Sequence, residues 1–273
     1  MIAGSVYYQL TADIDLDNAA WTPIGTSGSQ TFKGNFDGNK HKVSGMIVTS
    51  GEYRGLFGFI DGGNVQNLGV EGSVSGGYTS GGLVSRLAGG SVINCYSAVN
   101  VNGFHSQGGL VGSVEGGSSI INCYTTGEVS GLMTVGGVVG GFDWSSSVTN
   151  CYATGAVSGT WGVGGVAGNA GYGSLINCAA LNPSVNRGEG SSETNFGRVE
   201  SDNIGTLTNC VAWDEMELPS GTLTGYNGTD ITTAQIKADG TLGGRFTTAN
   251  GWTIENGKLP GFGAAVALPA HLQ

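Results

Sequence analysis

Residues 109–124 read GLVGSVEGGSSIINCY, and the motifs at the two ends of this stretch recur along the chain. A Gly-Leu-Val-Gly-like motif begins at residues 55, 82, 109, 137 and 165, at spacings of 27, 27, 28 and 28. The Asn of the Asn-Cys-Tyr motif lies at residues 67, 94, 122, 150, 177 and 209, at spacings of 27, 28, 28, 27 and 32. Two motifs that keep the same phase over five repeats indicate a repeat protein.

The repeat unit has the signature of β-strands. Its apolar runs, such as residues 120–124, are short, rich in β-branched and aromatic residues, and bounded by Gly and Ser. The helical return of a leucine-rich repeat is absent from the pattern, and a propeller blade needs ~40–45 residues. The sequence therefore predicts an all-β fold, a single-stranded parallel β-helix (solenoid) of about six to seven coils with N- and C-terminal caps, stacked ~4.8 Å apart.

Stacking predicts where the side chains of each repeat point. Alternate residues of a strand face opposite sides, so the Cys of Asn-Cys-Tyr is expected inside the coil and the Tyr outside. The Asn column is expected to form an amide ladder at a bend. The Gly column at residues 58, 112, 140 and 168 is expected inside, where a side chain would clash. In-register cysteines have poor disulfide geometry and lack the Cys-x-x-Cys spacing of a zinc site, which favours an inert buried ladder.

The repeats divide the chain into three parts of one structural domain. We expect an N-terminal cap with the first strands at 1–44, β-helix repeats at 45–212, and a C-terminal cap at 213–273. Within the C-terminal cap, residues 232–237 predict the start of a short helix and residues 252–254 a closing strand. The N-terminal residues 1–4 do not resemble a signal peptide.

Composition narrows the function classes. The chain has 273 residues, of which 53 are Gly, yet 39% are hydrophobic and only 5 are Pro, which excludes collagen and disfavours disorder. The net charge of -10 and the absence of a basic run argue against binding to nucleic acid or to an acidic membrane surface. No apolar run approaches the ~20 residues of a membrane span, so membrane insertion is not expected.

Several segments resemble the GLUG motif of bacterial cell-surface proteins. They are the Gly-Leu-Phe-Gly and Gly-Leu-Val-Gly motifs at 55–58 and 109–112, the Trp-Thr-Pro-Ile-Gly segment at 21–25, residues 36–43, and the Trp-Thr-Ile-Glu-Asn-Gly-Lys-Leu-Pro ending at 252–260. The resemblance covers nearly the whole chain, although Ser85 departs from the motif.

The resemblance implies a right-handed parallel β-helix. It also implies a secreted or surface-anchored protein, because the family includes adhesin-like proteins and non-catalytic regions of immunoglobulin A protease-like proteins. It carries over no catalytic residue, and the chain has no His-Glu-x-x-His motif of a zinc protease.

One column of the repeat supports an enzyme as the alternative. Glu115 and Asp143 would lie on adjacent coils, at a separation similar to the ~5–5.5 Å of a retaining glycosidase pair. The alternative function is therefore a polysaccharide-degrading enzyme, a lyase or glycoside hydrolase, on a β-helix scaffold. Acidic residues beside Gly and Ser are, however, more often ordinary turn residues.

Two further sets of residues are candidate binding sites. Asp13, Asp15 and Asp17 alternate with apolar residues and would share one strand face, which is a weak signal for calcium, since a solvated strand face in the cap is the more common explanation. Tyr96, Tyr124 and Tyr152 would form an outward aromatic strip that could hold sugar rings or only stabilise the sheet.

We therefore predict a non-catalytic extracellular module of a bacterial surface protein. It is expected to be a monomeric module of a larger chain, adhesin-like, and either to bind a glycan or a host surface protein or to act as a stalk. No cofactor is expected beyond the calcium suggested by the aspartates.

Overall fold

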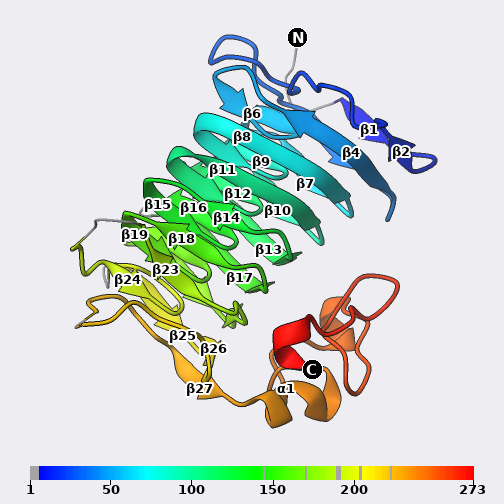
Figure 1. The fold of residues 1–273 in the computed structure, drawn as a ribbon. Coiled ribbons are helices and arrows are strands. Elements are labelled where there is room, and N and C mark those ends of the chain that lie inside the picture. The colour runs from blue at the N-terminus through cyan, green and yellow to red at the C-terminus, as the bar shows by residue number, and fades with distance from the viewer. Residues whose placement is uncertain (1–5, 144, 170, 189–191, 203–204, 222) are drawn as a thin grey trace.

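The computed structural model describes residues 6–143, 145–169, 171–188, 192–202, 205–221 and 223–273. The chain winds into a parallel β-solenoid of about seven turns, as predicted. Figure 1 shows the coils stacked in sequence order from β4 to β26, with the C-terminal segment beside them. The predicted cap at 1–44 begins outside the described residues, because residues 1–5 are not among them.

Five short strands form one face of the solenoid in the described part of the chain. This sheet contains one strand from each of five successive coils and is ordered β20-β16-β12-β9-β6. The strands are β6 (Phe57–Asp61), β9 (Val84–Ala88), β12 (Val111–Glu115), β16 (Val139–Phe142) and β20 (Ala167–Asn169).

The remaining described strands form a continuous 22-stranded sheet around the other faces. In chain order they are β1 (Tyr7–Gln9), β2 (Ile14–Asp15), β3 (Asn35–Asp37), β4 (Lys42–Val48), β5 (Tyr53–Arg54), β7 (Asn64–Gln66), β8 (Gly69–Gly81), β10 (Ser91–Ile93), β11 (Tyr96–Gly108), β13 (Ser119–Thr125), β14 (Val129–Ser130) and β15 (Met133–Gly136). They continue with β17 (Ser147–Ala153), β18 (Val157–Gly159), β19 (Trp161–Gly164), β21 (Ser174–Ile176), β22 (Ala179–Ala180), β23 (Val185–Arg187), β24 (Phe196–Gly197), β25 (Thr206–Thr208), β26 (Val211–Trp213) and β27 (Thr229–Ile231).

The strand register follows the sequence repeat. Cys123 pairs with Cys151 and Tyr124 with Tyr152, so equivalent residues of successive repeats lie directly above one another. Stacking places the side chains of the Gly-Leu-Val-Gly leucines inside the coils, where Leu83 and Leu110 have no exposed surface. The Gly column is also interior: a Cβ on Gly112 would lie 2.6 Å from the backbone oxygen of Ser80, and a side chain there would clash.

The Asn column forms the predicted amide ladder. Each Asn has a φ of 52–53°, a left-handed conformation that Asn tolerates at a bend. Each Nδ2 donates to the Oδ1 of the Asn one coil before, at distances of 2.8–3.2 Å, from Asn94 through Asn209. Each end of the ladder meets a charged side chain of complementary sign. The first amide, Asn67, donates to the Asp37 carboxylate, and the last amide, Asn209, accepts from the Arg245 guanidinium.

The five cysteines form a second interior column. All five are free thiols and all are buried, as predicted from their spacing. Burial raises the pKa of Cys95 and of Cys151, which keeps these two thiols protonated. The column therefore fills space in the core as small apolar side chains do.

The C-terminal segment leaves the solenoid after β27. It contains the helix α1 (Thr233–Asp239), which confirms the prediction at 232–237; Thr232 caps it by accepting from the backbone of Gln235. Two short 3-10 helices follow, η1 (Thr248–Asn250) and η2 (Ala270–Leu272). The prediction of a closing strand at 252–254 is wrong, because Thr253 makes only an isolated antiparallel bridge to Gly261. None of the helices in the described residues has the length and apolarity to span a membrane.

Candidate functional site

The three predicted ligand-binding tyrosines stack on the outside of the coils. The Tyr96 and Tyr124 rings are 5.2 Å apart with a 9° angle between their planes, and the Tyr124 and Tyr152 rings are 5.1 Å apart at 4°. The prediction of an exposed strip is nevertheless wrong for two of them. Tyr152 has no exposed surface and Tyr124 only 7%, whereas Tyr96 is partly exposed.

The C-terminal segment covers these two rings. Trp252 packs against Tyr124 and Tyr152 at 6.3 and 6.0 Å, and Phe246 meets the edge of Tyr152 at 5.6 Å. The Tyr152 hydroxyl donates to the Pro260 carbonyl at 2.6 Å, and burial raises its pKa, so it remains a donor. Tyr124 and Tyr152 therefore serve as the docking surface of the C-terminal segment. Of the three tyrosines, only Tyr96 remains accessible, at the edge of the stack.

The two candidate catalytic carboxylates each have a structural partner. Glu115 forms an ion pair with Arg86 at the end of β12. Asp143 follows β16 and caps a turn: it accepts from the Ser146 hydroxyl at 2.8 Å and from the Gly116 backbone at 3.0 Å. Glu115 and Asp143 do follow one another in register, but neither carboxylate is an unpartnered acid or base.

The three N-terminal aspartates have separate roles. Asp13 accepts from His41 at 2.9 Å and from the Lys42 backbone. Asp15 accepts from the backbone of Asp17, whose φ of 50° places it in a turn. Among the described residues no three His, Cys, Asp or Glu side chains gather as metal ligands would.

A different outward column carries large side chains that are exposed or half-buried. Tyr78, His105, Met133 and Trp161 occupy equivalent places in four successive coils, at spacings of 27, 28 and 28 residues. The Tyr78 and His105 rings stack 4.8 Å apart, and Met133 pairs in register with Trp161. Their neighbours Phe104 and Leu132 are 52% and 53% exposed, and Tyr78 is 65% exposed. We call these six residues the apolar ridge.

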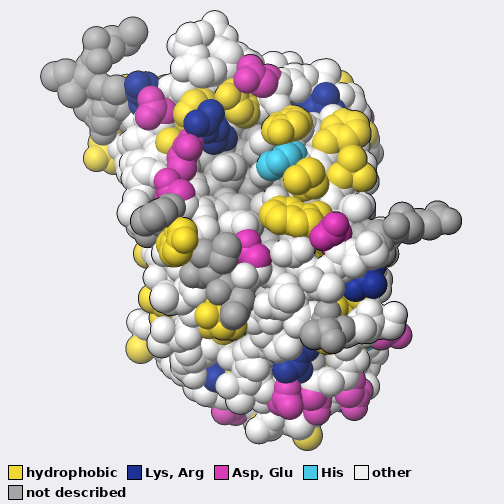
Figure 2. All heavy atoms as spheres, turned by 90° about the vertical axis from the view of Figure 1, so that its left-hand side faces the viewer, with side chains coloured by type: hydrophobic (Ala, Val, Ile, Leu, Met, Phe, Trp, Pro, Cys, Tyr) yellow, Lys and Arg dark blue, Asp and Glu magenta, His cyan; other side chains and the backbone are white. Residues whose placement is uncertain are grey.

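A register irregularity lies next to the ridge. The pairing between β11 and β8 shifts on both sides of Gly103, which is a local break in the regular ladder. Figure 2 shows this face: a histidine lies among hydrophobic side chains, with acidic and basic side chains to one side. Next to the ridge is a hollow of about 280 Å³ whose lining includes Tyr53, Tyr78 and the Arg86–Glu115 ion pair.

Comparison with known proteins supports the repeat assignment. The family model described as the GLUG motif matches residues 106–130 and 131–158. The chain therefore contains GLUG repeats at these residues. Its solenoid is similar to the crystal structure, at 1.30 Å, of an immunoglobulin A1 protease-like protein from Bacteroides ovatus, with a TM-score of 0.75 and 25% identity over 94% of this chain and 86% of that one. Curated protein sequences give no match.

The GLUG repeat also contains the signal that would have revealed the ridge. The ridge residues recur with the same period as the Asn column, but their types change from Tyr to His, Met and Trp. A search for repeated motifs finds columns of identical residues. It misses a column whose residues differ in type and share only a large side chain on the outside of the coil.

Proposed function

We propose that this GLUG-repeat chain is a non-catalytic module of a bacterial secreted or cell-surface protein, and that it binds a host protein, as an adhesin does, through the apolar ridge. The observation that carries the proposal is a column of one large side chain per coil over four coils, exposed at Tyr78 and Met133 and half-buried at His105 and Trp161. Contiguous exposed apolar surface on a soluble protein usually marks a contact site. The GLUG repeats and the likeness to the protease-like protein support the extracellular setting.

The composition of the ridge favours a protein partner over a glycan. Tyr, Phe, Trp and Met are enriched in protein interfaces, as is Arg, which Arg86 supplies at the rim. The Tyr78 and His105 rings stack on each other, with 16° between their planes. Each ring therefore covers one face of the other, which leaves one face per ring for contact with a partner.

An enzymatic role has less support from the same face. The Arg86 guanidinium is held by Glu115 and lies over the Phe59 ring at 4.7 Å, and its pKa is raised by the hydrogen bond to Glu115. A permanently charged Arg86 cannot take a proton from a substrate, and the Glu115 carboxylate is already paired with Arg86. The hollow beside the ridge therefore suits recognition better than acid–base chemistry.

The proposal is tested by the binding of purified protein to mucin-secreting epithelial cells. A Tyr78→Ser/Trp161→Ser double variant should lose at least about tenfold in binding, because interface aromatics are common hot spots. The matched control is Tyr7→Ser/Leu218→Ser, which changes two exposed apolar residues away from the ridge, 78% and 36% exposed.

Treatment of the cells separates the two partner classes. Protease treatment should abolish binding, while enzymatic removal of glycans should leave it. The proposal is refuted if the ridge variant binds as the wild type does, or if binding survives loss of the surface proteins and disappears with the glycans. Absence of binding by the wild-type protein would leave the stalk role instead.

A further inference from the structure

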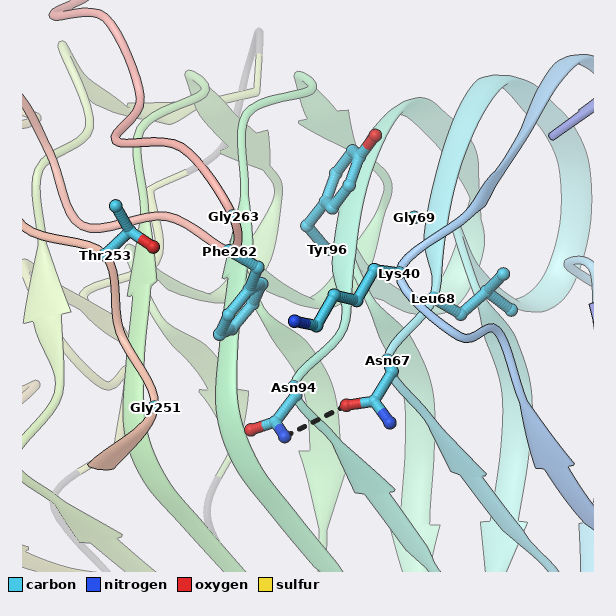
Figure 3. A pocket seen from close by; sticks show the side chains of 10 residues that line it. All are labelled: Lys40, Asn67, Leu68, Gly69, Asn94, Tyr96, Gly251, Thr253, Phe262 and Gly263. Carbon is cyan, nitrogen blue, oxygen red and sulfur yellow. Dashed lines mark hydrogen bonds between the residues drawn. The ribbon is translucent and has the colours of Figure 1, made fainter. Parts of the chain in front are cut away.

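A cavity of about 190 Å³ opens where the accessible edge of the tyrosine stack meets the C-terminal segment. Figure 3 shows the Tyr96 and Phe262 rings on either side of it, the Asn67 and Asn94 side chains below, and the Lys40 ammonium pointing into the space between them. Pockets for drug-sized ligands span ~300–1,000 Å³, so this cavity is sized for a single small ring.

Both rings of the cavity are held in place before any ligand arrives. Tyr96 stacks on Tyr124, and its hydroxyl donates to Glu71 at 3.1 Å. Phe262 stacks on Trp252 at 4.5 Å with 25° between the planes. Aromatic walls fixed in this way can take up a flat, partly apolar ligand with little loss of side-chain freedom.

The cavity carries an unbalanced positive charge. The residues that line it include Lys40 but no Asp or Glu. Lys42, two residues away, pairs with Glu71 at 3.0 Å, whereas Lys40 has no ion pair among the described residues. Glu71, the nearby acid, is thus already shared between Lys42 and the Tyr96 hydroxyl. In a chain with a net charge of -10, an unpaired lysine at a cavity favours an anionic ligand.

The amide ladder supplies donors for oxygen atoms. One coil further on, Asn122 uses one Nδ2 hydrogen for the ladder and the other for the Asn250 carbonyl of the C-terminal segment, at 3.0 Å. Asn94 makes the same ladder bond to Asn67, and its side chain lines the cavity. The C-terminal segment therefore shows how a ladder amide binds an oxygen from outside the coils.

We propose that this cavity binds one acidic sugar residue. The sugar carboxylate pairs with the Lys40 ammonium, a hydroxyl accepts from Asn94, and the C–H faces of the ring pack between Tyr96 and Phe262. This site is separate from the apolar ridge, and the proposal does not rest on the function proposed for the ridge.

Calorimetric or NMR titration of the full chain with glucuronate and N-acetylneuraminate tests the proposal. At least one of them should bind, and Lys40→Gln should weaken that binding at least about tenfold, since a charge-assisted hydrogen bond is lost. Phe262→Leu should weaken it as well by removing one ring wall. Lys237→Gln removes an equal charge outside the cavity and should leave binding unchanged.

Glucose and acetate separate the contributions of ring and charge. Glucose lacks the carboxylate and acetate lacks the ring, so each should bind at least about tenfold more weakly than the acidic sugar. The proposal is overturned if neither acidic sugar binds the wild-type protein at about 50 mM, if Lys40→Gln binds equally well, or if acetate binds as tightly as the sugar. The ridge variant should retain sugar binding and Lys40→Gln should retain cell binding, so the two proposals fail independently.

Discussion

Replacing Asn122 by Ala is the most direct test of the amide ladder. The Asn122 side chain donates to Asn94 at 3.2 Å and to the Asn250 carbonyl at 3.0 Å, and it accepts from Asn150 at 3.0 Å. A hydrogen bond of this kind contributes about 0.5–1.5 kcal/mol net. Loss of all three therefore lowers the free energy of unfolding by about 1.5–4.5 kcal/mol.

The backbone adds a second, separable contribution. Asn122 has a φ of 53°, and a residue such as Ala in this left-handed region costs about 1–2 kcal/mol. Asn122→Ala is thus expected to destabilise the protein by about 2.5–6.5 kcal/mol in all. Asn122→Gly removes the same hydrogen bonds without most of this strain, and its loss should be smaller by about 1 kcal/mol.

Urea unfolding followed by circular dichroism measures these differences. The denaturant slope must stay equal between variants, because a solenoid can also unfold in parts. Asn102→Ala is the control: it removes one exposed hydrogen bond, to Ser130 at 2.8 Å, and should cost less than about 1 kcal/mol. The reasoning fails if Asn122→Ala is no more destabilising than this control. If Asn122→Ala and Asn122→Gly lower the free energy of unfolding equally, the backbone-strain contribution is refuted and the hydrogen-bond contribution stands.

Three further outcomes follow from the buried columns and the ladder end. The five cysteines should resist a thiol reagent in the native protein and all react in urea; rapid native labelling would contradict their burial. Partial burial raises the pKa of Asp37, but hydrogen bonds from Asn67 and Gln66 outweigh it and leave the pKa lowered. The resulting stability is present above the unfolded-state pKa and is lost as pH falls through the folded one, so Asp37→Asn should flatten an acid unfolding curve measured from pH 7 downwards. Tyr152→Phe leaves the Pro260 carbonyl without its donor and should cost about 1–3 kcal/mol, seen as faster hydrogen exchange at 246–262 rather than in the coils.

The repeated part of the fold is predictable because stacking places equivalent residues of successive repeats next to one another. A residue that recurs as Asn every 27 or 28 positions must lie above another Asn, and amides in that position pair. The same logic places Cys123 above Cys151 and inside the coil. The period therefore fixes the register, the inward and outward faces, and the ladder without any knowledge of distant contacts.

The cover over the tyrosine stack could not be predicted in this way. The repeat phase correctly puts Tyr124 outside the coil, but it carries no information on what packs there. Trp252 and Phe246 belong to a segment outside the repeat, whose position depends on contacts more than 90 residues away in sequence. An outward aromatic column is therefore either a binding strip or a docking surface for the chain itself, and only the three-dimensional structure distinguishes them.

Both candidate surfaces of this solenoid arise where a column departs from the identical residues of the repeat. In the tyrosine column, Gly69 takes the place of the next ring, and Tyr96 leans over it, since a Cβ on Gly69 would clash with that ring. The stack ends there, and the cavity beside Lys40 opens. The ridge column keeps the period but changes residue type from coil to coil, and it lies next to the register shift at Gly103. Regular columns satisfy their own hydrogen bonds and packing, so they leave little for a ligand to use. In this architecture the repeats provide the stability, and the departures from the repeat are the places to look for recognition.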